Sequence, residues 1–333
     1  MSGPRFAVTT AIRFLLLAAC SAARAQTSSV APETIPLWAF PLTSSTTSPT
    51  ASQREYYTLP GSTRKFSSAQ LRDRTTAVDW FPGDHPAMPA AVRGGSGPLA
   101  CGFCHLPDGQ GRPENASLAG LPYAYLMQQL SDMKSGARQL ADPHFVPGSL
   151  MLQAAAQTPD AAVDQAARYF SDLRYAKRVK VVEAASIPSS RADGYVYVFD
   201  ATAPRQPLGA RIVEGPNDFS RFEERDSRTT YTAYVPAGSV ARGAALAKGN
   251  GKARQACVTC HGSRLQGGPI GPPLAGRSPT GIFRQLYAFQ LGTRHGPGAL
   301  LMKPIVADLS RNEMIALAAY AGSLRQFARA LPP

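Results

Sequence analysis

Acidic residues and tryptophan are scarce in this 333-residue sequence, and a long apolar run is missing. There are 22 Asp plus Glu against 35 Lys plus Arg, so the formal charge is +13. The one apolar run, near the N-terminus, is too short to span a bilayer, which excludes a polytopic membrane protein. The positive charge is typical of nucleic-acid binding, but the sequence contains no recognisable nucleic-acid-binding module, so we expect no nucleic-acid partner. The length suggests about two domains.

The first 25 residues have the features of an export leader. Arg5 and Arg13 provide a charged start, an apolar centre follows, and Ala23-Arg24-Ala25 is a small-residue cleavage site. The run Leu17-Ala18-Ala19-Cys20 offers an alternative, a lipoprotein leader in which Cys20 carries the lipid anchor. Both interpretations predict an exported, periplasmic protein.

The other four cysteines form two identical C-x-x-C-H patterns, at Cys101, Cys104 and His105 and at Cys257, Cys260 and His261. This pattern is typical of covalent c-type haem attachment. Two thiols one helical turn apart can each add to a haem vinyl group, and the histidine that follows becomes the proximal iron ligand. Zinc and disulfide sites are the alternatives, but structural zinc favours paired motifs about 15 to 20 residues apart. These motifs are 156 apart (257 minus 101), so we expect two covalently attached haems with their iron.

An offset of 156 residues also aligns the sequence downstream of the two motifs. It places Leu118-Ala119-Gly120 on Leu274-Ala275-Gly276, Gln129 on Gln285 and Arg138 on Arg294. Five extra residues in the first copy then change the offset to 151, which pairs Met151 with Met302 and Tyr169 with Tyr320. This agreement indicates two copies of one haem-binding unit.

The paired methionines are the candidate sixth ligands of the two irons. A thioether opposite histidine favours ferrous iron and raises the reduction potential, as suits an electron carrier. We expect Met302 to serve in the second copy, from a short stretch before a helix, and Met151 at the equivalent place in the first. Core packing is the alternative for any methionine. It is the better interpretation of Met127 and Met133, which align with phenylalanines.

The histidines outside the motifs are weaker candidates. His144 lies within the five-residue expansion of the first copy and is the rival of Met151 for the same iron. His85 and His295, like Met88, are expected at the surface or beside a site.

Helix signals predict small all-helical haem domains. In the second copy we expect a helix capped by Ser239 and running to Lys248, another over 281–291 that Gly292 ends, and a last one after a capping box at Ser310 and Glu313. In the first copy, Pro122 begins a helix that Gly136 ends, and Thr158-Pro159-Asp160 opens another.

The sequence resembles the class I cytochromes c, and within them the two-domain dihaem members. The resemblance covers residues 80–175 and 236–330 and rests on the two motifs, the Leu-Ala-Gly segments, the paired methionines and the closing helices. It implies that a backbone carbonyl of a Gly-Pro-x-Leu turn accepts the other ring proton of the proximal histidine. Gly271-Pro272-Pro273-Leu274 matches that turn, whereas the first copy has Asn115-Ala116-Ser117-Leu118.

The arginines Arg138 and Arg294 are candidate partners of the haem propionates. Solvated charges at helix ends are the alternative for both.

We expect a mainly α fold with two tandem class I cytochrome c domains and a small β-containing connector. Within the connector, residues 195–199, 210–213 and 230–234 have the composition of strands. The expected bounds are 1–25 for the leader, 26–54 for a flexible Ser/Thr/Pro-rich tether, 55–175 for the first domain with an N-terminal extension, 176–235 for the connector and 236–333 for the second domain.

These features predict an exported electron-transfer protein without catalytic activity of its own. It would carry electrons between a dehydrogenase or other respiratory donor and an acceptor by Fe(II)/Fe(III) cycling, with redox proteins such as a membrane dehydrogenase or oxidase as partners. The alternative is a dihaem enzyme, such as a peroxidase or a thiosulfate-oxidising dehydrogenase, which needs one iron with open or unusual ligation. Two symmetric methionines argue against it.

The positive charge is concentrated in the second copy. The 81 residues between Asp226 and Asp308 (308 minus 226, minus one) include ten basic residues and no acidic one, whereas residues 93–172 include five basic and seven acidic. We therefore expect the second domain to dock on an acidic partner or an anionic membrane surface.

Overall fold

The computed structural model describes residues 35–42, 54–95, 98–249 and 255–325, together with residues 1 and 3. The described residues from Ile35 to Arg325 belong to one compact unit. The expected leader, with Cys20, and most of the expected tether lie outside the described residues. No helix within the described ranges is both long enough and apolar enough to cross a membrane.

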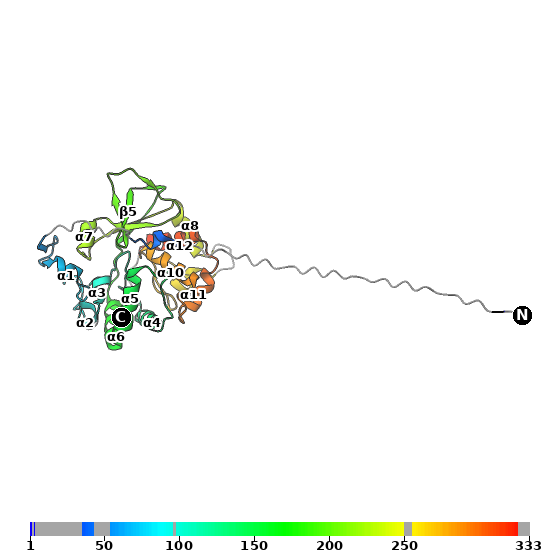
Figure 1. Ribbon diagram of the computed structural model, residues 1–333, viewed down its shortest axis with the longest axis horizontal. Helices are drawn as coiled ribbons and strands as arrows, with labels where there is room; N and C mark the ends of the chain where they lie inside the picture. Colours follow the sequence, from blue (N-terminus) through cyan, green and yellow to red (C-terminus); the bar gives the residue numbers. More distant parts are fainter. Residues whose placement is uncertain (2, 4–34, 43–53, 96–97, 250–254, 326–333) are drawn as a thin grey trace. The chain divides into compact units, whose positions relative to one another are not determined.

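Residues 54–173 contain the first haem-attachment motif and its helices (Figure 1). A short hairpin comes first and has its own small core around Trp80 and Phe81. The motif lies on α3, and α4 and α6 pack against each other in a core that includes Leu126 and Phe170. The elements are β1 (Tyr56–Tyr57), β2 (Phe66–Ser67), α1 (Ser68–Arg72), α2 (Ala90–Arg93), α3 (Cys101–His105), α4 (Tyr123–Lys134), α5 (Val146–Gln157) and α6 (Asp160–Asp172).

Residues 239–323 repeat this arrangement around the second motif. Two of the expected caps are present: Gly292 ends α10 in the left-handed conformation, and Ser310 with Glu313 forms the capping box of α12. The expected cap at Ser239 is wrong, because Gly238 is the N-cap residue and Ser239 is already helical and buried. The elements are α8 (Ser239–Ala247), α9 (Cys257–His261), α10 (Pro279–Leu291), α11 (Ala299–Val306) and α12 (Arg311–Ser323).

The first helix of each copy packs on the last, but the two copies differ in its length. In the second copy α8 crosses α12 at Gly243, where a Cβ atom would lie only 2.0 Å from the carbonyl oxygen of Ala316. In the first copy the corresponding helix, α2, has four residues and contacts α6. Pro89 precedes it and Gly94, with a φ of 122°, ends it. The opening helix of the first copy is therefore reduced to one turn.

Main-chain hydrogen bonds repeat with both sequence offsets. The amide of Gly111 donates to the carbonyl of His105 (3.0 Å), as that of Gly267 does to His261 (2.8 Å), at the 156-residue offset. The amide of Gly120 donates to Phe170, as that of Gly276 does to Ala321, which combines the 156- and 151-residue offsets. The two copies therefore share a backbone fold and not only a motif.

Strands occupy most of the segment between the copies. β3 (Val179–Glu183) pairs in parallel with β9 (Tyr231–Val235), and β9 pairs antiparallel with β8 (Val213–Pro216). The expected strands 195–199 and 230–234 fall one residue from β6 and β9, but 210–213 reaches only the first residue of β8. The remaining elements are β4 (Ser186–Ile187), β5 (Ser189–Asp193), β6 (Val196–Asp200), β7 (Gln206–Pro207) and α7 (Phe219–Glu223).

A short part of the expected flexible tether is packed into the protein. Residues 37–39 form a 3₁₀ turn, and Ala39 and Phe40 are buried in the core that includes the second haem domain. The ring centroids of Trp38 and Phe283 are 4.5 Å apart. Six of the eight residues 35–42 are apolar, so this stretch differs from the Ser/Thr-rich sequence around it, and burial of its aromatic side chains stabilises the packed conformation.

Candidate haem-binding sites

Each C-x-x-C-H motif forms a five-residue helix, α3 or α9. The helical conformation places the two thiols of a motif one turn apart, as attachment to two vinyl groups requires. All four cysteines are free thiols. Burial raises the pKa of Cys101 to about 11 and raises that of Cys257, so both are protonated thiols at neutral pH.

The proximal histidines are held in the same way in both copies. Nδ1 of His105 hydrogen-bonds to the carbonyl oxygen of Ala116 at 2.7 Å, and Nδ1 of His261 to that of Pro272 at 2.8 Å. A carbonyl can only accept, so Nδ1 carries the proton and donates it, which leaves Nε2 free as a metal ligand. Burial lowers the pKa of both histidines and keeps the rings neutral. The first copy thus keeps the carbonyl without the proline.

This donor set fits haem attachment. Each site offers two reduced thiols and a neutral imidazole with a fixed tautomer. The described ranges contain no cluster of three or more histidine, cysteine, aspartate or glutamate side chains arranged to hold a metal ion.

The candidate axial methionines are both half-buried and helical. Met151 lies in α5 and Met302 in α11, where Met302 packs against the large core that includes the second domain. Met302 precedes the closing helix α12 as expected, but the short stretch that carries it is itself a helix, α11, which spans Ala299–Val306 with Pro304 inside it. The rival His144 is exposed, and its backbone N–H donates to Asp142.

The other candidates differ in their exposure. His295 is exposed, and Met88 and Met127 pack against the core of the first domain. His85 hydrogen-bonds to Asp79, and this contact raises its pKa.

Arg138 and Arg294 are brought together across the two copies. Their main chains form an antiparallel bridge, flanked by hydrogen bonds from Gln139 to Thr293 and from His295 to Ala137. Each guanidinium donates to the side-chain oxygens of both Gln129 and Gln285, at 2.6–3.1 Å. Exchanging the copies reproduces the four bonds, so a local twofold relation connects them. The alternative of solvated charges is wrong, because Arg294 is buried and Arg138 is half-buried with its guanidinium bonded to amide oxygens.

The field around this cluster is positive. Burial and the neighbouring Arg294 hold the pKa of Arg138 below its usual range. Burial opposes ionisation of Tyr125, yet Arg294 and Arg138 outweigh it and lower the pKa of this phenol. The nearby carboxylate of Asp132 is bonded to Gln128. Two buried guanidinium groups that bond to neutral amide oxygens form a site suited to an anion.

Sequence reasoning missed two further arginines that join the copies. Arg277 of the second copy donates to the carbonyls of Ser117 and Ala119, and Arg284 to those of Ala39 and Pro113. The loop that fixes His105 is therefore clamped by the second copy. The only signal in the sequence is that these arginines lie in a stretch without acids, which by itself suggests surface charge.

Comparisons with known proteins find relatives among the cytochromes c. The family profile described as cytochrome c oxidase, cbb3-type, subunit III matches residues 244–320. The thiosulfate dehydrogenase electron acceptor of Stutzerimonas stutzeri is 27% identical over 240 residues, which are 71% of this chain and 84% of that protein. Cytochrome c-554(548) of Halomonas halodenitrificans is 41% identical over 68 residues, 20% of this chain and 82% of that protein. A solved thiosulfate dehydrogenase from Marichromatium purpuratum is 27% identical with a TM-score of 0.46, over 71% of this chain and 39% of that one.

Proposed function

The chain belongs to the cytochrome c family as a dihaem member, and on that premise we propose that it is an exported carrier that takes electrons from a dehydrogenase or other respiratory donor. The observation that carries the proposal is the pair of buried histidines, His105 and His261, each fixed by a carbonyl. The bound haems supply the one-electron Fe(II)/Fe(III) chemistry. The chain's own part is to hold the ligands rigid, so that little reorganisation accompanies a change of iron charge.

The proposed ligand sets are His105 with Met151 and His261 with Met302. Two half-buried methionines at equivalent repeat positions support this assignment. We also assign the haem propionates to Arg138 and Arg294, because each of these guanidinium groups donates to the amide oxygens of Gln129 and Gln285 and a propionate would add negative charge beside them.

The proposed architecture has a first domain over 55–175, a connector over 176–235 and a second domain over 236–333. The leader over 1–25 would direct the protein to the periplasm, and Cys20 is the site of a lipid anchor if the leader is of the lipoprotein type.

The proposed donor is a thiosulfate dehydrogenase. Support comes from the relative whose name describes it as the electron acceptor of that enzyme and of which this chain covers 84%. An acceptor role also suits two equivalent sites, whereas the enzymatic alternative requires the two sites to differ in ligation.

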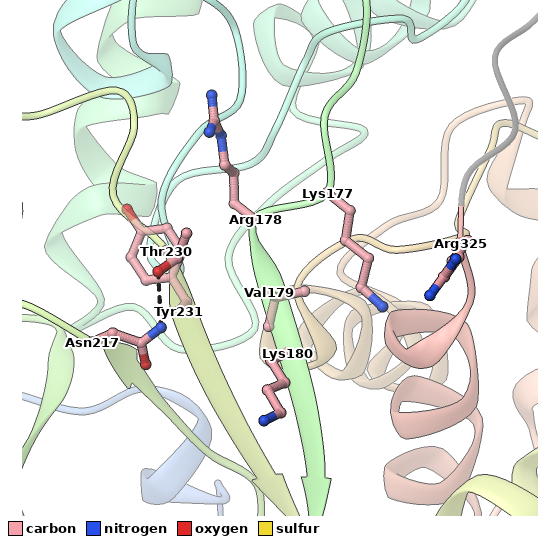
Figure 2. A pocket seen from close by; sticks show the side chains of 8 residues that line it. All are labelled: Lys177, Arg178, Val179, Lys180, Asn217, Thr230, Tyr231 and Arg325. Carbon is pink, nitrogen blue, oxygen red and sulfur yellow. Dashed lines mark hydrogen bonds between the residues drawn. The ribbon is translucent and has the colours of Figure 1, made fainter.

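An open groove supports the proposal of an acidic docking partner. Its volume is about 560 Å³, and of the eight described residues that line it four are basic and none is acidic (Figure 2). Lys177, Arg178 and Lys180 come from the start of β3 and its approach, and Arg325 follows α12. Burial and the charge of Arg325 lower the pKa of Lys177. A carboxylate in the groove would relieve this repulsion, as the acidic surface of a redox protein can.

The exposed charge of the second copy is smaller than the sequence suggests. Arg277, Arg284 and Arg294 are buried, and Lys252 and Arg254 lie outside the described residues. Five of the ten basic residues are exposed: Arg228, Arg242, Lys248, Arg264 and Lys303. These five and the groove are the basis for docking.

The test is reduction of the purified dihaem protein by thiosulfate dehydrogenase and thiosulfate, followed in the visible haem spectrum. We expect both haems to be reduced when enzyme and substrate are present. Thiosulfate alone should have no effect. Reduction by thiosulfate alone would favour the enzymatic alternative, and no reduction with the dehydrogenase present would exclude it as donor.

A further inference from the structure

Arg225, from the segment between the two haem domains, reaches into the first attachment motif. Its guanidinium carbon lies 3.3 Å from the centroid of the Phe103 ring, and Phe103 directly precedes Cys104. Nη1 donates to the carbonyl of Phe103 and Nε to that of Leu71, both at 2.9 Å. The hydrogen bonds of this cation therefore go to neutral carbonyl oxygens. Among the described residues it forms no ion pair with a carboxylate, although Glu114 and Glu223 lie near enough to act on its charge.

The backbone of Arg225 is in the left-handed region, with a φ of 58°. This conformation costs a non-glycine residue about 1–2 kcal/mol, and the position follows α7, where glycine or asparagine would be favoured. An arginine kept at such a place indicates that its side chain has a role there.

A second arginine joins the same region to α7. Arg112, in the loop that supplies the Ala116 carbonyl to His105, donates to the carbonyl of Phe222 at 2.9 Å and lies 3.6 Å from the centroid of its ring. It also forms a buried ion pair with Glu114, 3.3 Å apart. The second oxygen of Glu114 is buried without a hydrogen-bond partner. Through the ion pair, the negative charge of this carboxylate partly balances the positive charge of Arg112. Arg225 has no such ion pair among the described residues.

Glu223, at the end of α7, is the other nearby carboxyl. Burial has a larger effect on Arg225 than either carboxyl and lowers its pKa to about 9, so the guanidinium stays charged at neutral pH.

The second copy has no equivalent of this arrangement. The residues aligned with Phe103, Arg112 and Glu114 at the 156-residue offset are Thr259, Gly268 and Ile270, and all three are exposed. The loop beside His261 therefore faces solvent, where water screens charge, while the loop beside His105 is closed by buried charged groups.

We propose that Arg225 tunes the first haem: its buried positive charge raises the reduction potential of the haem attached at Cys101 and Cys104 and leaves that of the second haem unchanged. Ferric haem carries one more positive charge than ferrous haem, so a nearby cation in a low-dielectric site favours the reduced form. The effect adds to that of methionine ligation and makes two similarly ligated haems unequal. The proposal needs only the attached haem and does not depend on which donor or acceptor the protein uses.

The test is a redox titration of the full dihaem protein with Arg225→Met and Arg225→Lys. We expect Arg225→Met to lower the reduction potential of the first haem. At a fixed solution potential its ferrous-to-ferric ratio should fall three- to tenfold, where tenfold corresponds to about 59 mV. Arg225→Lys, which keeps the charge, should stay close to the unmodified protein. The titration contains two redox transitions, one from each haem. Met151→His and Met302→His each change the proposed ligand of one haem and so show which transition belongs to which copy.

Glu114→Gln provides a test of opposite sign that leaves Arg225 in place. Removing this carboxylate should raise the potential of the first haem. Arg242→Met, on the exposed surface of α8, removes one charge from the protein and should change neither potential. Equal shifts for Arg225→Met and Arg225→Lys, movement of both haems together, or a lower potential for Glu114→Gln would each overturn the proposal.

Discussion

Arg138 and Arg294 face each other across the two haem domains in an antiparallel main-chain bridge, and both guanidinium groups share the same two glutamine oxygens. This arrangement places two positive charges in the interior of the protein. Burying a charge is costly unless it is hydrogen-bonded, so each guanidinium depends on its bonds to the glutamines. The interface between the copies is thus polar at its centre and depends on a few residues.

Arg138→Met should lower the free energy of unfolding by about 1–3 kcal/mol, because Gln129 and Gln285 each lose a buried donor. Urea unfolding of the dihaem protein measures this. Arg168→Met is the matched control, since Arg168 is exposed and pairs with Asp164 four residues earlier, which is worth about 0.5 kcal/mol. An increase in stability for Arg138→Met would mean that repulsion between the arginines outweighs their hydrogen bonds.

Met302→Ala should lower the potential of the second haem while leaving the haem covalently attached. The thioether ligand is lost, but the bonds to Cys257 and Cys260 remain. Redox titration and a stain for covalent haem measure the two effects separately. Met127→Ala is the control, because Met127 packs in the core. An unchanged potential in the Met302 variant would exclude it as ligand.

Gly271→Ala should disturb the second haem site. A Cβ atom there would lie 2.7 Å from Nδ1 of His261 and 3.0 Å from the carbonyl oxygen of Cys260, so the ring or the turn must move. We expect a loss of about 1–3 kcal/mol in stability and a changed spectrum of one haem. Gly298→Ala has open space around it and is the control. A normal spectrum and stability for Gly271→Ala would show that the turn adapts.

Asp108→Asn should change how stability depends on pH. Burial raises the pKa of Asp108 to about 6, from an ordinary value of 3.8. The folded state then binds the proton more tightly than the unfolded state, so this stabilisation is complete below pH 4 and is lost as the pH rises through 6.

The loss amounts to at most about 3 kcal/mol, at 1.36 kcal/mol for each pKa unit. Asparagine resembles the protonated acid, so the variant should match the unmodified protein near pH 4 and exceed it in stability near pH 7.5. Asp172→Asn, at an exposed position, is the control. Lower stability of Asp108→Asn near pH 7.5 would show that the contact with Arg178 outweighs burial.

Electron transfer with an acidic partner should slow as ionic strength rises, because charge attraction is screened over about 8 Å at physiological salt. Stopped-flow rates over a salt series measure this. Lys180→Glu and Arg264→Glu should slow the reaction several-fold and flatten its salt dependence, whereas Arg64→Glu in the first domain should not. Rates that do not vary with salt would contradict docking by charge.

The sequence predicted the parts of the fold that depend on neighbouring residues. The capping box at Ser310 and the left-handed stop at Gly292 are local signals, and both are present. The resemblance of Gly271–Leu274 to the family's turn implied that a backbone carbonyl there is the partner of His261, and the structure has the carbonyl of Pro272 in that role. These features need only a few consecutive residues to form.

The features that sequence reasoning missed depend on distant contacts. Helix α11 has no polar face and contains a proline, so its sequence does not resemble an amphipathic helix. The burial of Ala39 depends on Arg284, which is 245 residues away. Arg277 and Arg284 have the composition of surface residues, and only the meeting of the two copies buries them.

The twofold relation around Arg138 and Arg294 also has a consequence for ancestry. A contact in which each copy presents the same patch, with residue pairs exchanged, is the isologous interface of a symmetric homodimer. A single-haem protein that dimerised through this glutamine and arginine patch would acquire the present arrangement by gene duplication and fusion alone. The two copies could then diverge, with a shortened first helix in one and a sheet between them, while this interface continued to hold them together.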